Sequence, residues 1–350
     1  MKTTFVSTSA INNATREART DLQVKLAQGQ KEATTGRLAD VGLSLGYLTE
    51  RTVSMRQDLD RLTTFKDTNT IASSRLELSQ STLEGISESA QEFLSTLMAA
   101  RAAPSSAGVA INDAKAKLTA FIGSMNSAVN GAQLFSGINT DVKPINDYFS
   151  DPPSAGRDAI NSAFETTFSM PMDGSVDPST ISATDMQAFL DGTYSDLFSE
   201  TNWKSTWSQA SDQNITTRIS TNERIETSAN ANADPFRELA SIYAMISDFP
   251  IDKLDDETYQ VVVDKAIAVV GQAIGDLTGL RAQLGTSQER IAASNERMDL
   301  QKTILNEHVS FLEGVDPYEA SANVNALLTQ IQTAYALTAR LQNLSLVNYI

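Results

Sequence analysis

Few residues in this sequence could carry out chemistry. The chain has no Cys, which excludes disulfides and thiolate metal sites, and its single His, His308, leaves no His-dependent triad and few zinc sites. The loop Asp173–Asp177 lacks the alternating acids and the distal Glu of a calcium loop. We therefore interpret the loop as a turn and His308 as a surface or seam residue.

The remaining polar and aromatic clusters also have structural interpretations. Asp255, Asp256 and Glu257 are adjacent carboxylates, but they precede a long apolar pattern and suit the positive end of a helix. Trp203 and Trp207 are expected to fill a small core. No acid, base and nucleophile converge, so we expect no enzyme activity, no cofactor and no metal.

Charge and hydropathy restrict the partners. The net charge of −16 opposes binding to nucleic acid and favours solubility. No run approaches the ~18 apolar residues of a membrane span. The first nine residues contain no apolar h-region, so no cleavable secretory signal is expected and any export would use a route that needs none.

Two long heptad series stand near the two ends of the chain. Each has eight positions seven residues apart, and only Asn69 is polar, which favours coiled-coil-like rods over surface helices of a globule. Asn69 either sets the register of the seam or faces solvent. The positions are Leu48, Met55, Leu62, Asn69, Leu76, Leu83, Ala90 and Leu97, then Val263, Val270, Leu277, Leu284, Ile291, Met298, Leu305 and Leu312.

Shorter amphipathic helices are predicted outside the rods. One covers residues 10–35 and is followed by the linker Gly36–Gly42; the other begins after Gly314–Pro317 and has almost no charge. Helices of this length are marginal in water without packing. They must pack on each other, on other subunits, or remain disordered until they do so.

The middle of the chain has a different character. A third helix is predicted from Ile111 to near Gly137, and the pattern then dissolves until Pro235 starts another helix that Pro250 ends. Residues 138–234 are expected to form a small mixed or β-rich domain. It should contain a hairpin turning at Thr221–Asn222 and a short helix at Ala183–Leu190.

These patterns predict a mainly α protein. Long antiparallel coiled-coil-like helix rods come from both chain ends, and a small β-containing domain is inserted between them. The expected domains are residues 1–44 plus 314–350, residues 45–137 plus 235–313, and the insert 138–234.

This arrangement resembles the flagellin superfamily, and within it the junction type, hook-associated protein 3. Three stretches carry the resemblance: Ile11–Leu38, which ends in Ala-Thr-Thr-Gly-Arg-Leu; Asn130–Gly137, with its Leu-Phe-Ser-Gly turn; and Tyr335–Ile350, with its Leu-Ser-Leu ending. The segment Ala39–Gly46 departs from the Asp-Asp-Pro-like sequence of many members. The resemblance covers about 250 residues and omits the insert.

The resemblance implies a structural component of the bacterial flagellum at the hook–filament junction. Its partners would be hook-associated protein 1, flagellin, identical subunits in a ring and a flagellar export chaperone, with secretion through the type III channel and neither nucleic-acid binding nor membrane insertion. A filament flagellin is the alternative, and an intracellular coiled-coil adaptor is less favoured.

The apolar stripes of the terminal helices are the predicted assembly interface, because such stripes need a partner. In the assembled wall, the stripe of the last helix should meet the stripe of the first. The residues are Ile11, Ala18, Leu22 and Leu26, with Val324, Leu327, Ile331 and Leu341.

Overall fold

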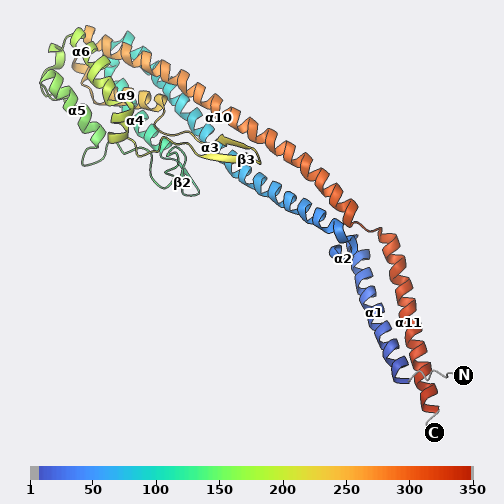
Figure 1. The fold of residues 1–350 in the computed structure, drawn as a ribbon. Helices are drawn as coiled ribbons and strands as arrows, with labels where there is room; N and C mark the ends of the chain where they lie inside the picture. Colours follow the sequence, from blue (N-terminus) through green and yellow to red (C-terminus); the bar gives the residue numbers. More distant parts are fainter. Residues whose placement is uncertain (1–7, 348–350) are drawn as a thin grey trace. The chain divides into compact units, whose positions relative to one another are not determined.

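The computed structural model describes residues 8–347, with side chains described for residue 10 and for residues 13–340. The chain divides into two compact units. The terminal unit contains the residues up to Thr64 and those from Arg297 on; the central unit is Phe65–Glu296. Two long helices, α3 (Thr49–Ala102) and α10 (Asp256–Glu313), contribute to both units. The fold is mainly α, as predicted (Figure 1).

The terminal unit is built on two antiparallel helices that lie side by side (Figure 1). These are α1 (Thr8–Thr35) and α11 (Pro317–Val347), which match the predicted terminal helices. Between α1 and α3 the chain forms two short elements, α2 (Val41–Leu45) and the 3-10 turn η1 (Gly46–Leu48). Three alternatives were open for the terminal helices: packing on each other, packing on other subunits, or disorder. In the structure the two helices pack on each other.

In the central unit, α3 and α10 pack as an antiparallel pair. The Gln80 side chain donates to the Arg281 carbonyl at 2.7 Å, and the Tyr259 hydroxyl donates to the Ala100 carbonyl at 2.9 Å. The predicted heptads are confirmed, because their central-unit positions are buried between the helices. Asp255 begins α10, as predicted, by accepting from the backbone N–H groups of Glu257 and Thr258, and these bonds lower the pKa of its carboxyl.

Asn69 is fully buried, so the solvent-facing alternative is wrong. Its amide nitrogen donates to the Asn295 side chain at 2.8 Å and to the Ile219 carbonyl at 3.1 Å. Ser294 donates to the same carbonyl at 3.0 Å. Ile219 belongs to a β-hairpin, so Asn69 joins both rods to that hairpin, which the heptad pattern alone did not predict.

A second helical layer, α4 and α9, packs beside the long pair in the central unit. α9 (Asp234–Asp248) occurs as predicted, with Pro235 in its first turn. α4 (Ala107–Met125) follows the 3-10 turn η2 (Pro104–Ser106) and ends twelve residues before Gly137. The predicted end near Gly137 is therefore wrong. Asn130 and Gly131 have positive φ and turn the chain between β1 (Ala128–Val129) and β2 (Ala132–Gln133), which a helix cannot accommodate.

The insert contains more helix than strand, so the β-rich alternative is wrong. Its β structure is the hairpin of β3 (Thr216–Ser220) and β4 (Glu223–Glu226), which turns at Thr221–Asn222 as predicted. The predicted short helix is confirmed as α6 (Ala183–Phe189). The other elements of the insert are α5 (Ala155–Phe168), η3 (Pro178–Thr180), the π-helical turn η4 (Leu190–Tyr194), α7 (Ser195–Leu197) and α8 (Glu200–Thr206). Outside the insert, η5 (Ile251–Lys253) lies between α9 and α10.

The insert's core is aromatic and continuous with the rod core. Trp203 and Trp207 are buried and stacked with ring centroids 5.3 Å apart, as the sequence predicted for core residues. Phe164, Phe189, Tyr194 and Phe249 form an adjoining cluster. These side chains fix α5 to α8 on the end of α9.

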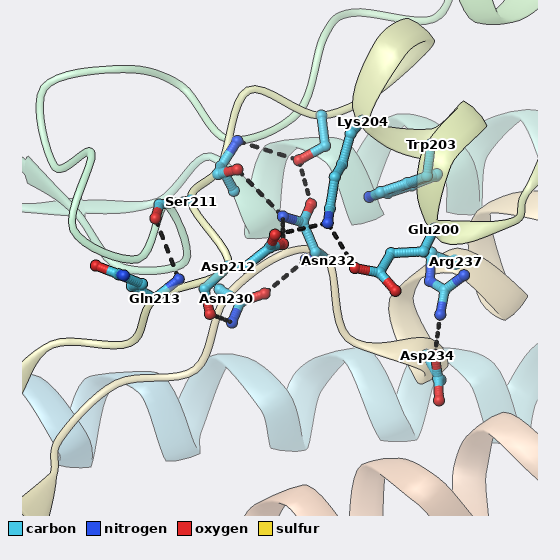
Figure 2. Close-up of polar contacts among 12 residues, drawn as sticks. Glu200, Trp203, Lys204, Ser211, Asp212, Gln213, Asn230, Asn232, Asp234 and Arg237 are labelled. Atoms are coloured by element: carbon cyan, nitrogen blue, oxygen red, sulfur yellow. Dashed lines mark hydrogen bonds and ion pairs between the residues drawn. The ribbon is translucent and has the colours of Figure 1, made fainter.

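A polar network closes the loops between α8 and α9 (Figure 2). Lys204 pairs with Glu200 and with Asp212, whose carboxylate also accepts from Asn232 at 2.8 Å. The same loops hold the Leu-Phe-Ser-Gly turn, because Ala231 donates to the Phe135 carbonyl at 2.8 Å.

Gly137 ends that turn with a φ of 63°. A Cβ atom here would lie 2.5 Å from the carbonyl oxygens of Ser211 and Gln213, so two backbone segments would have to move. We expect Gly137→Ala to lower the free energy of unfolding of the central unit by about 3 kcal/mol, from overpacking and backbone strain.

The control is Gly123→Ala, because Gly123 lies on α4 with no atom near its Cβ position. That change should stabilise by about 0.5–1 kcal/mol through helix propensity. Urea titrations followed by tryptophan fluorescence measure both variants. Equal midpoints for Gly137→Ala and the wild type would contradict the close approach.

Candidate assembly surface

The seam between α1 and α11 lies at the predicted spacing on α11. Ala320 is buried, and Val324, Leu327, Ile331, Ala334 and Thr338 are half-buried at intervals of three and four. On α1, Leu22 and Leu26 are half-buried, whereas Ala18 is exposed. Ile11 lies on α1 and Leu341 on α11, but the side chains of both lie outside the described residues.

Gly29 of α1 lies close to Val324 of α11. It is buried, and a Cβ atom there would lie 3.2 Å from Val324 Cγ2. Further along, Tyr335 accepts from the Gln23 side chain at 3.2 Å, and the Arg19 guanidinium lies 5.4 Å from its ring centroid. Glycine thus permits close packing near Val324, and Tyr335 contacts two polar side chains of α1 further along the seam.

The two chain breaks of the terminal unit are joined by backbone hydrogen bonds. Leu38 donates to the Glu313 carbonyl at 2.8 Å, and Val315 donates to the Gly36 carbonyl at 3.0 Å, around an antiparallel bridge between Arg37 and Gly314. Gly36 has a φ of 65°, which favours glycine. The predicted linkers therefore meet and pair with each other.

A buried ion pair lies beside this bridge. Glu313, the last residue of α10, is 1% exposed, and Arg56 of α3 binds both of its carboxylate oxygens. These bonds raise the pKa of Arg56, so the guanidinium stays charged. A carboxylate this buried needs such a partner, and Arg56 thereby fixes the end of α10 to α3.

Large apolar side chains remain exposed around the breaks. Leu43, Tyr47, Phe311 and Tyr318 are 80–90% exposed. The unit also has no net charge: residues 1–64 and 297–350 contain 12 Lys and Arg and 12 Asp and Glu, so the whole charge of −16 belongs to residues 65–296. A unit with no net charge and with exposed large apolar side chains suits close association, because those side chains can be buried against a neighbour and the units of neighbouring copies would not repel one another.

In residues 8–347, no helix is long and apolar enough to cross a membrane. Across the same stretch, no three His, Asp or Glu side chains gather as a metal site would require.

Family comparisons agree with this arrangement. Residues 6–140 match the bacterial flagellin N-terminal helical region, and residues 267–350 match the bacterial flagellin C-terminal helical region. The chain belongs to the flagellin family. As a flagellin-family member it is a structural component of the flagellum, and the family indicates a structural, non-enzymatic role. The matched regions are the two chain ends that build the terminal unit and the long rods.

A solved structure shares the fold of this flagellin-family chain. A putative flagellar hook-associated protein from Vibrio parahaemolyticus superposes with a TM-score of 0.52 at 9% identity, over 77% of this chain and 99% of that one. Bacillus cereus FlgL gives a TM-score of 0.48 at 9% identity, over 73% of this chain and 98% of that one. Among curated protein sequences, none matches significantly.

Sequence reasoning missed the ion pair and the backbone bridge at the breaks. The glycines at 36 and 314 signalled both breaks, but a pairing between positions 37 and 314 leaves no periodic trace. Glu313 stands directly before Gly314, at the end of the second predicted rod. A charged residue directly before a glycine break, with an Arg in the facing rod, is the one signal that was present.

Proposed function

We propose that the chain is a hook–filament junction protein that connects hook-associated protein 1 to the flagellin filament. It would be secreted through the flagellar type III channel with an export chaperone and would form a ring of identical subunits. The observation that carries this proposal is the α1–α11 seam, which is half-exposed in a unit with no net charge. The fold shared with a chain described as a putative flagellar hook-associated protein supports the same role.

The proposed mechanism is geometric. Each subunit would present its terminal hairpin to neighbours through the remaining stripe residues, Ala18 on α1 and the exposed edge of α11 among them. Repeated heterologous contacts generate rings or helical arrays. In this proposal, the terminal residues 1–44 and 314–350 form the wall of the assembled tube. The rods lie next to them in sequence, and the insert 138–234 is the variable domain.

A gene deletion tests the proposal. A strain without this chain should build hooks and export flagellin monomers into the medium, but it should bear no filaments. Normal hooks with filaments would overturn the junction role. If the purified chain alone polymerises into long filaments, the chain is a filament flagellin instead.

A further inference from the structure

A groove follows the seam between α9 and α10 in the central unit. Lys265, Val269 and Gln272 of α10 line a pocket of about 290 Å³ together with Arg237 and Glu238 of α9. Asp276, Gly279 and Gln283 line a second hollow of about 430 Å³, and Asp234 lines both. The α10 positions recur every three or four residues, so both hollows lie along one helix face.

The cations in this groove already have partners. Lys265 donates to Asp191 at 2.7 Å, and Arg237 pairs with Asp234 and donates to the Phe198 carbonyl at 2.9 Å. Lys265 is therefore balanced by Asp191, and Arg237 pairs with Asp234 while offsetting the charge of Glu238 only in part.

Two carboxyl groups of the groove, those of Glu238 and Asp276, form no ion pair within the described part of the chain. Glu238 accepts from Gln272 at 2.8 Å through one oxygen, while its other oxygen is buried and has no hydrogen-bond partner. Among the described side chains, no Lys or Arg forms an ion pair with Glu238 or Asp276. The groove therefore holds two carboxyl groups with no described Lys or Arg paired to them.

The electrostatics of Glu238 agree with a missing counter-ion. Burial raises the pKa of its carboxyl to about 7, and the nearby carboxylates of Asp276 and Asp234 add to this, with only partial compensation from Arg237. Near neutral pH the carboxyl is therefore only partly ionised. A cation placed beside it would favour the ionised form.

The groove is also open to a polypeptide backbone. Gly279 is exposed, and no atom lies within 4 Å of its Cβ position, so a chain can approach the helix closely there. Val269 of α10 and Tyr194 of η4 add apolar and aromatic wall to the first pocket, against which the methylene stem of a Lys or Arg can pack.

We propose that this groove is a docking site for a basic protein segment. The segment lies along α10 over Gly279 and places a Lys or Arg side chain beside Glu238, near Asp276. Charge complementarity selects this occupant, because the central unit carries all of the net charge of −16, neither carboxyl group is in an ion pair with a described side chain, and one Glu238 oxygen has no hydrogen-bond partner. The site is separate from the assembly surface of the terminal unit.

Binding of a labelled hexalysine peptide to the full chain tests the proposal, with hexaglutamate as the opposite-charge comparator. Hexalysine should bind about tenfold more tightly at pH 8 than at pH 6, because Glu238 gains its charge over that interval while ordinary carboxyls are already ionised. The double variant Glu238→Gln/Asp276→Asn should weaken binding at pH 8 at least about tenfold and lose the pH dependence.

The matched control is Glu165→Gln/Glu289→Gln, which removes the same charge from exposed positions outside the groove. It should change binding less than about twofold, because exposed charges are screened, and should keep the pH dependence. Equal weakening by both double variants, or no binding of hexalysine, would overturn the proposal. A further outcome would also overturn it. If the chain self-associates, the groove variant abolishes that self-association and hexalysine does not compete with it, the occupant is a second copy of the chain.

Discussion

Ile331→Asp is expected to abolish incorporation of the chain into flagella while residues 65–296 remain folded. Ile331 is half-buried on the α11 seam against α1. A charge there loses roughly 1.5–3 kcal/mol of apolar burial and adds the desolvation of a carboxylate. Every subunit of a repeating array would carry that loss. The measurement is the count of flagellated cells in a strain making only the variant, with thermal melting of the purified chain.

Gln332→Asp provides the control, because it adds the same charge at the next position, which is exposed. Filaments at normal frequency with Ile331→Asp would refute the assembly role of the seam. Loss of the central unit's melting transition would show instead that the stripe supports the folding of the whole chain.

Arg56→Ala is expected to destabilise the joined breaks of the terminal unit by about 2–3 kcal/mol. It leaves the Glu313 carboxylate, which is 1% exposed, without its cation. This destabilisation is at or below the low end of the range for breaking a buried ion pair, because the Arg56 side chain is about half exposed. Amide exchange of Leu38 and Val315 measures the effect, since their N–H groups make the bridging hydrogen bonds.

Arg61→Ala serves as the comparison. Arg61 pairs with Asp58 on the same exposed helix face, and such pairs contribute about 0.3–0.5 kcal/mol. If exchange at Leu38 and Val315 is equally fast in both variants, the buried pair does not stabilise the bridge.

The rods could be predicted because their residues obey a short period. Buried positions seven apart on α3 and α10 report directly on one helix face, so both the helices and their facing seams followed from the sequence. The α11 stripe followed for the same reason. On α1 the pattern was weaker, because Thr15 and Arg19 share the half-buried face with Leu22 and Leu26 while Ala18 does not.

The insert was harder to predict because its core depends on contacts between distant residues. The stacked pair Trp203 and Trp207 and the phenylalanines of α5 and α6 meet in space without a common period in the sequence. Proline and loop residues there suggested β structure, although tertiary packing supports short helices. The end of α4 was missed because Asn130 and Gly131 require a turn that the apolar pattern did not reveal.

The paired breaks have a mechanical consequence for the terminal unit. A single unpaired chain break acts as a swivel, because rotation about its backbone bonds lets the two flanking helices turn freely. Here two breaks cross side by side and are tied by the hydrogen bonds of Leu38 and Val315, with the Arg56–Glu313 pair next to them. Such a joint can bend about an axis that passes through both breaks, but it resists torsion. A twist applied to α10 is therefore transmitted to α11 and α1 together.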